Sequence, residues 1–101
     1  MNHDSISVKI NPLLAELVPK FLERSRQNVV ELQDAVRSAD FDASRRIGHA
    51  LHGTAGSFGF EEMAEIGKDI ERAARACDSA TLKKLGERLD SHLSRLRPVF
   101  E

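Results

Sequence analysis

Apolar residues recur at helical spacing in four long segments of the chain. Within each segment they stand three, four or seven residues apart, which places them on one face of a helix and leaves the polar positions facing water. We find no alternating strand pattern of convincing length, so the pattern predicts an all-α fold. The predicted helices run over residues 20–38, from a cap at Asp40 to the region 56–59, over residues 61–76, and from a cap at Asp78 to Pro98. Their predicted buried positions are Phe21, Leu22, Val29, Leu32 and Val36; Phe41, Ile47, Leu51, Ala55 and Phe58; Met63, Ile66, Gly67, Ile70 and Ala74; and Leu82, Leu85, Leu89, Leu93 and Leu96.

The N-terminal part of the chain predicts one further, short helix. Asn11 followed by Pro12 is typical of an N-cap with proline at the first helical position, and the helix is expected to reach about Leu17 before Pro19 restarts or bends it. Residues 1–10 are expected to be a frayed, flexible end, and His3 within them carries no functional signal. The folded domain is therefore expected over residues 11–101.

Four amphipathic helices joined by short connections can bury their apolar faces only against one another. The expected fold is an antiparallel four-helix bundle with the short additional N-terminal helix across one end. A chain of 101 residues is sufficient for one hydrophobic core. We therefore expect a single domain and a monomer.

The charge and cysteine content narrow the possible partners and the compartment. Fifteen Lys plus Arg balance sixteen Asp plus Glu, so no overall attraction to nucleic acid or an anionic membrane is expected, and the expected partners are proteins. One cysteine, Cys77, excludes an internal disulfide and suits a reducing compartment. We find no signal peptide and no apolar run of membrane-spanning length, so a cytoplasmic location is expected. Beside Ala73, Ala74 and Ala76, Cys77 is expected to be a small apolar filler.

The segment Gly48–Phe60 contains four glycines and two histidines, although glycine inside a helix costs about 1 kcal/mol relative to alanine. At about 100° per residue, His49 lies about 160° from the inward-facing Leu51 and should be exposed. Gly53 and Gly56 share its side of the helix, where they leave room for a large group to approach. A neutral imidazole is a nucleophile at cytoplasmic pH, and the nearby side chains of Arg45, Arg46 and His52 suit an anion such as a phosphoryl group.

The sequence contains no glycine-rich phosphate loop with its lysine and no obvious carboxylate cage for magnesium. A partner must therefore complete any phosphoryl chemistry, and we expect no cofactor. A zinc site is a weak alternative. His49 and His52 have suitable i, i+3 spacing, but such a site needs at least a third ligand, and Cys77 lies at the far end of the next helix. No metal site is predicted.

The segment His49–Gly59, HALHGTAGSFG, resembles the helical hallmark His-x-Leu-Lys-Gly-(Ser/Thr/Ala)-Ala-x-x-x-Gly of histidine-containing phosphotransfer (HPt) domains of bacterial phosphorelays. The resemblance continues in the next predicted helix, where Met63, Ile66 and Gly67 are followed by Glu71 and an alanine-rich end. With the preceding DFDASRRIGH and the bundle pattern, it covers nearly the whole chain. The resemblance implies a four-helix bundle that carries a phosphoryl group and is not itself a kinase.

The same resemblance implies a role for several residues. His49 would accept a phosphoryl group from an aspartyl phosphate of one receiver domain and pass it to another receiver domain, with a hybrid sensor histidine kinase upstream. Gly53 would leave room for the receiver. His52 stands where the family usually has a phosphate-steadying lysine, and Glu71 stands where a glutamine often faces the histidine. Because a histidine loses its charge as the pH rises past neutrality, we expect phosphorylated His49 to turn over in a pH-dependent way.

Other interpretations stay open at this point. The chief alternative is a helical adaptor or scaffold, in which the glycine-containing surface around His49 only docks another protein. A metal-binding bundle is a further alternative. Arg45 and Arg46 are equally consistent with a solvated face. Gly48 and Gly56 are also consistent with close helix packing or, for Gly56, with helix termination. His92 lies close to a leucine stripe, which favours a partly buried histidine with a hydrogen-bond partner over a second phosphoacceptor.

Overall fold

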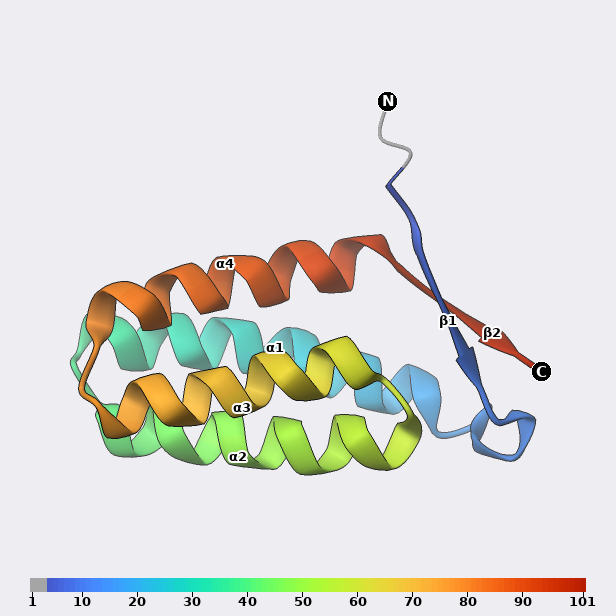
Figure 1. Cartoon of the computed structure of the whole chain (residues 1–101), viewed down its shortest axis with the longest axis horizontal. Coiled ribbons are helices and arrows are strands. Elements are labelled where there is room, and N and C mark those ends of the chain that lie inside the picture. The colour runs from blue at the N-terminus through green and yellow to red at the C-terminus, as the bar shows by residue number, and fades with distance from the viewer. Residues whose placement is uncertain (1–3) are drawn as a thin grey trace.

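The computed structural model describes residues 4–101, which form four long helices and a two-stranded sheet (Figure 1). In chain order the elements are β1 (Ile6–Ile10), the single 3-10 turn η1 (Pro12–Leu14), α1 (Val18–Arg37), α2 (Phe41–Phe58), α3 (Glu61–Arg75), α4 (Ser79–Arg95) and β2 (Leu96–Phe100). The helix α1 packs against α2 and α4, and α3 packs against the same two neighbours. This closed ring confirms the predicted bundle of four helices. None of the helices in the described part combines the length and apolar character needed to cross a membrane.

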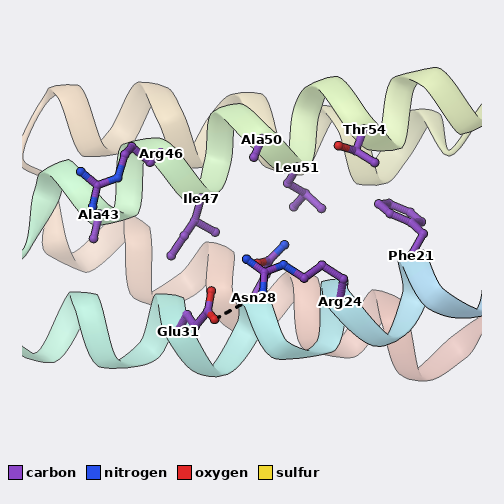
Figure 2. A pocket seen from close by; sticks show the side chains of 10 residues that line it. All are labelled: Phe21, Arg24, Asn28, Glu31, Ala43, Arg46, Ile47, Ala50, Leu51 and Thr54. Atoms are coloured by element: carbon purple, nitrogen blue, oxygen red, sulfur yellow. Dashed lines mark ion pairs between the residues drawn. The ribbon is translucent and has the colours of Figure 1, made fainter.

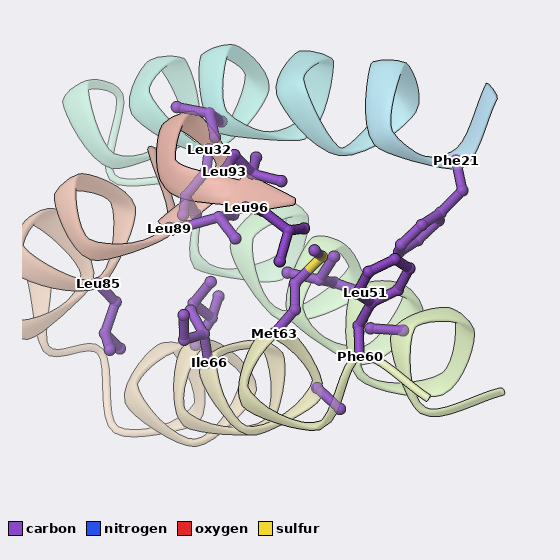
Figure 3. Close-up of a cluster of buried hydrophobic side chains, with 14 of the residues drawn as sticks. Phe21, Leu32, Leu51, Phe60, Met63, Ile66, Leu85, Leu89, Leu93 and Leu96 are labelled. Atoms are coloured by element: carbon purple, nitrogen blue, oxygen red, sulfur yellow. The ribbon is translucent and has the colours of Figure 1, made fainter. Parts of the chain in front are cut away.

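The core lies between the four helices, as the apolar spacing predicts. Every predicted inward position of α3 is buried, as is every one assigned to the last helix. Figure 3 shows side chains of α4 and of Leu96 lying among Leu32 of α1 and Met63 and Ile66 of α3. The predicted positions Leu22, Val36, Phe41, Ile47 and Phe58 are only partly buried and pack against this core.

Phe60 is a core residue that helical spacing could not identify, because it precedes the first turn of α3 and belongs to no stripe. It is 1% exposed, and its ring stacks on Phe21 of α1 with the ring centroids 5.6 Å apart. The ring of Phe58 also stacks on Phe21, with the centroids 4.8 Å apart, and lies 6.3 Å from the ring of Phe60. These three aromatic rings bury a large apolar area at one end of the bundle.

The helices are joined by very short turns that follow one pattern. The backbone N–H of Asp40 donates to the carbonyl of Ala35, and that of Asp78 donates to the carbonyl of Ala73. This bond spans five residues and closes the last turn of each helix, as in a Schellman motif. The side chains of Asp40 and Asp78 then accept hydrogen bonds from backbone N–H groups in the first turn of the following helix, which confirms both predicted caps.

The residue before each of these caps has a left-handed backbone. The φ angle is 54° at Ala39 and 53° at Cys77, and the equivalent position after α2 is Gly59 at 93°. Cys77 is exposed in this turn, so the predicted role as a small apolar filler does not hold. A turn that reverses the chain at the bundle end directs its central side chain toward solvent, whatever its apolar character.

The ends of the chain differ from the prediction. Residues 6–10, expected to be frayed, form β1, which pairs in parallel with β2 so that Ile6 lies opposite Leu96. The last helix ends at Arg95, because Leu96 adopts an extended backbone and Pro98 lies within β2. Ile10 is 1% exposed and joins the core. A five-residue alternation is too short to identify a strand when its partner lies at the other chain end. His3 lies outside the described residues.

The short additional N-terminal helix is also not found. The Asn11 side chain does accept a hydrogen bond from the N–H of Leu13 at 2.9 Å, which confirms the cap, but only the turn η1 follows. No residue of this turn is buried, and Leu13 is 88% exposed. A short helix without a packed apolar face is too weak to persist. Pro19 instead lies in the first turn of α1.

Candidate functional site

His49 lies in the middle of α2 with 72% of its side chain exposed to solvent. The inward-facing Leu51, two residues further along, is 1% exposed. The exposure expected from helical geometry is therefore confirmed. An imidazole in this position is open to approach by a large partner.

Glu71 of α3 holds one nitrogen of this imidazole. Its Oε2 lies 3.2 Å from Nδ1 of His49, and because an ionised carboxylate can only accept, Nδ1 carries the proton and donates. The lone pair of the neutral ring is then on Nε2, which faces away from Glu71. The Glu71 side chain is 14% exposed, and the Arg75 guanidinium donates to the same oxygen at 2.9 Å. The carboxylate is thus held between two partners, and it orients the ring.

Two glycines bring α2 and α3 close enough for this contact. A Cβ atom on Gly48 would lie 2.6 Å from the backbone nitrogen of Glu71, and one on Gly67 would lie 2.6 Å from the backbone nitrogen of His52. The helices therefore pack backbone against backbone at these positions. For Gly48, the close-packing interpretation is confirmed.

The remaining glycines of this face are in a different environment. A Cβ on Gly53 would have no heavy atom of the described residues within 4 Å, so this position opens directly to solvent. A Cβ on Gly56 would make an ordinary contact with the Cβ of Ala64 at 4.0 Å. Gly53 is therefore the position whose missing side chain leaves free space on the side of α2 that carries His49.

His52 is partly buried and already uses one ring nitrogen. Its Nδ1 lies 2.9 Å from the carbonyl oxygen of Ala64 in α3, and because a carbonyl can only accept, Nδ1 donates. In the neutral ring, Nε2 is then an acceptor. Nε2 of His52 can donate a hydrogen bond only when the ring is protonated.

Arg45 and Arg46 both pair with Asp42, one turn earlier in α2. The Arg45 guanidinium lies 3.1 Å from one carboxylate oxygen of Asp42, and that of Arg46 bonds the other. Within the described residues, neither guanidinium forms an ion pair or hydrogen bond with His49. The structure therefore brings Glu71 to His49 but leaves these two arginines on a neighbouring carboxylate.

A comparison with protein families identifies this arrangement. The family model described as the Hpt domain matches residues 16–98, which is most of the chain. The chain belongs to the Hpt domain family. Hpt domains have a phosphotransfer role in two-component signalling and interact with receiver domains and kinases in phosphorelays. Comparisons with curated proteins and with solved structures gave no match.

This Hpt domain has a groove between α1 and α2 that the sequence did not reveal (Figure 2). Its apolar lining includes Phe21 from α1 and Ile47 and Leu51 from α2. Ala50, the residue that follows His49 in the chain, also lines the groove. Arg46 lies along the groove with Arg24, whose guanidinium is 3.8 Å from a Glu31 carboxylate oxygen. The groove needs residues of two helices, which is why spacing within one helix could not predict it.

The Hpt domain also carries three cations on α3 that we did not predict as site residues. Lys68, Arg72 and Arg75 line a shallow pocket together with Glu71. Lys68 and Arg75 stand three and four residues from Glu71, and Arg72 stands four from Lys68 and three from Arg75, so the sequence already places them on one side of a helix. That spacing becomes informative only once Glu71 is known to contact His49.

His92 is more deeply buried than predicted, with 2% of its side chain exposed. Its Nδ1 has no hydrogen-bond partner among the described residues, and the nearest carboxylate oxygen, of Glu62, is 3.6 Å away. Burial lowers the pKa of His92, a shift that Glu62 opposes and that Arg95 and Arg88 reinforce. The predicted hydrogen-bond partner is therefore not found for Nδ1. Within residues 4–101, no three His, Cys, Asp or Glu side chains are grouped so as to hold a metal ion.

Proposed function

We propose that His49 accepts a phosphoryl group from the aspartyl phosphate of one receiver domain and passes it to an aspartate of another. The observation that carries this proposal is the 3.2 Å contact of its Nδ1 with Glu71 beside an exposed ring. The contact favours the tautomer whose Nε2 lone pair points to solvent. Both residues belong to one chain, so the site needs no second copy, which supports a monomeric carrier.

Bonds, electron pairs and protons balance in the proposed transfer step. The Nε2 lone pair of His49 forms a bond to phosphorus, and the bond from phosphorus to the aspartyl oxygen breaks. The electron pair of that bond leaves with the receiver carboxylate. Nδ1 keeps its proton, so the ring becomes a phosphorylated imidazolium whose positive charge faces the Glu71 carboxylate. The reverse sequence delivers the phosphoryl group to the next receiver.

The receiver supplies the rest of the chemistry in this proposal. Catalytic magnesium and the carboxylates that hold it belong to the receiver, because no nucleotide or magnesium motif was identified in this sequence. Gly53 and Gly56 provide access for the partner, and the open space at Gly53 supports that role. His52, Arg46 and Arg45 remain candidate phosphate-stabilising residues, with Arg45 and Arg46 requiring release from Asp42. The groove beside Ala50 offers an apolar docking surface for the receiver.

Transfer of label tests this function directly. The protein is mixed with a labelled, phosphorylated receiver domain from the same cell, and the product is examined for an acid-labile, base-stable phosphoryl group. We expect label in the parent and in His92→Gln, which removes a buried imidazole, and none in His49→Gln. Label that persists in His49→Gln would contradict the proposal. Binding without label would favour an adaptor.

A second comparison tests the access role of Gly53. Gly53→Trp adds a bulky side chain at a position where a Cβ would meet no neighbouring atom of the described residues within 4 Å. We expect it to slow transfer from the receiver at least tenfold, while a small donor, phosphoramidate, still labels His49 at the parent rate. Equal transfer from the receiver in parent and variant would contradict the access role.

A further inference from the structure

Lys68 is a cation on the same side of α3 as Glu71. Lys68 lines the same shallow pocket as Glu71, whose carboxylate contacts His49. The two residues are three positions apart in α3, so their side chains are neighbours on the helix surface. Lys68 therefore belongs to the surface from which Glu71 reaches the imidazole.

The contact between α2 and α3 places Lys68 beside His52 as well. Gly67, the residue before Lys68, packs directly against the backbone of His52, and Glu71 packs against Gly48. Along this antiparallel pair, Lys68 thus lies at the level of His52, and Glu71 lies at the level of His49. One helical turn separates the two levels. A lysine has a flexible four-carbon stem, so its ammonium group can extend from this level toward that of His49.

The other cations around the site are already paired. The Arg75 guanidinium bonds Glu71, and that of Arg72 lies 3.9 Å from Asp69. Arg45 and Arg46 pair with Asp42. Lys68 is exposed, and its ammonium group forms no ion pair or hydrogen bond with any residue from 4 to 101. It is therefore free to bind an anion without breaking an existing contact.

The neutral ring of His52 cannot provide this donor. Its Nδ1 hydrogen is donated to the Ala64 carbonyl, so the remaining nitrogen of the neutral ring presents a lone pair. This lone pair would repel the negatively charged phosphoryl oxygens. The phosphoryl group therefore needs a donor from another position.

We propose that Lys68 supplies this donor, contacting the phosphoryl oxygens at His49 from α3. The inference rests on the proposed function of His49. As the phosphoryl group moves to Nε2, the Lys68 ammonium group stabilises the charge on its oxygens by a charge-assisted hydrogen bond. Lys68 contributes no atom to the product and loses no proton.

The test uses phosphoramidate, a small phosphoryl donor that needs no protein partner, and the full chain. The rate of His49 labelling is the labelling rate of the protein minus the background rate measured in His49→Gln. We expect Lys68→Gln to be labelled about tenfold more slowly, which is less than the loss typical of a buried oxyanion donor because this site is open to water. Lys68→Arg should keep most of the parent rate. Lys83→Gln, which removes an exposed lysine next to the α1–α4 groove, should match the parent.

Salt separates an electrostatic role from a structural one. The difference between parent and Lys68→Gln should shrink as ionic strength rises, because salt screens exposed charges. A parent rate in Lys68→Gln, or equal slowing in Lys68→Arg and Lys68→Gln, would overturn the inference while leaving the proposed function intact. A parent that takes no label from either phosphoramidate or a phosphorylated receiver would overturn the proposed function, and this inference with it.

Discussion

Gly48 and Gly67 face each other so closely that neither position has room for a methyl group. A Cβ on Gly48 would lie 2.7 Å from the carbonyl oxygen of Gly67, and a Cβ on Gly67 would lie 2.9 Å from the carbonyl oxygen of Gly48. Because backbone atoms cannot move aside as flexible side chains do, either methyl group would push α2 and α3 apart. The same contact sets the distance between His49 and Glu71, so packing and chemistry are coupled here.

Gly48→Ala should therefore destabilise the protein, although alanine favours helices. We expect a loss of about 2 kcal/mol in the free energy of unfolding, from forced separation of the helices. Gly53→Ala in the same helix is the matched control and should raise stability by up to about 1 kcal/mol, because its methyl group enters open space. Urea unfolding followed by circular dichroism measures both. The same sign for the two variants would contradict this account.

Replacing Glu71 should separate its two contributions to His49. Glu71→Gln keeps an oxygen that accepts from Nδ1 but removes the charge opposite the phosphorylated ring, whereas Glu71→Ala removes both. We expect transfer from a phosphorylated receiver to fall about threefold in Glu71→Gln and about tenfold in Glu71→Ala, or about 1.4 kcal/mol for the latter. Label transfer under single-turnover conditions measures this. Glu71→Ala with the parent rate would show that ring orientation by Glu71 is unimportant.

The lifetime of phosphorylated His49 should depend on the protonation of His52. The neutral His52 ring has no N–H left for the phosphoryl group, because its Nδ1 hydrogen is donated to Ala64, so any loss of ring protonation between pH 6 and 8 removes this donor. His52→Lys stays charged across this range. We expect the lifetimes of parent and variant to agree near pH 6 and to differ by about threefold at pH 8, a size typical of an exposed charge contact. Superimposable curves from pH 6 to 8 would refute the role of His52.

Cys77→Gly should stabilise the fold. Cys77 has a φ angle of 53°, a left-handed conformation that is strained for residues with a Cβ, and its side chain is exposed. Relief of this strain should outweigh the added flexibility of the unfolded chain and give about 0.5–1 kcal/mol. Ala76→Gly, at a φ of −85°, is the control and should be destabilising. Thermal unfolding gives the comparison, and equal shifts for the two variants would contradict the strain argument.

His92 should make the protein less stable in mild acid. Burial lowers its pKa in the folded state, so the unfolded chain, with an ordinary value of 6.5, binds the proton first as the pH falls. Stability is therefore highest above about pH 6.5 and declines as the pH falls from there toward the lowered pKa of the folded state. His92→Leu should flatten this decline between pH 7 and 5, whereas His49→Gln should keep it. Urea unfolding at several pH values provides the test, and equal slopes in parent and His92→Leu would contradict it.

Local spacing was sufficient to predict much of this protein. The helices α1 to α4, the caps at Asp40 and Asp78, and the exposure of His49 depend on helical periodicity and on capping hydrogen bonds within a few residues. The motif around His49 is likewise contained in one helix. These features are visible in the sequence because the interactions that create them are short in range.

The tertiary structure decided what depends on two distant segments. Only the fold distinguishes Gly48, which is packed against a neighbouring backbone, from Gly53, which faces open space, since both are simply glycines in one helix. Only the fold pairs β1 with β2 and brings Glu71 of α3 to His49 of α2. The physical reason is that these contacts join residues whose separation along the chain follows no helical period, so they exist only once the helices have packed.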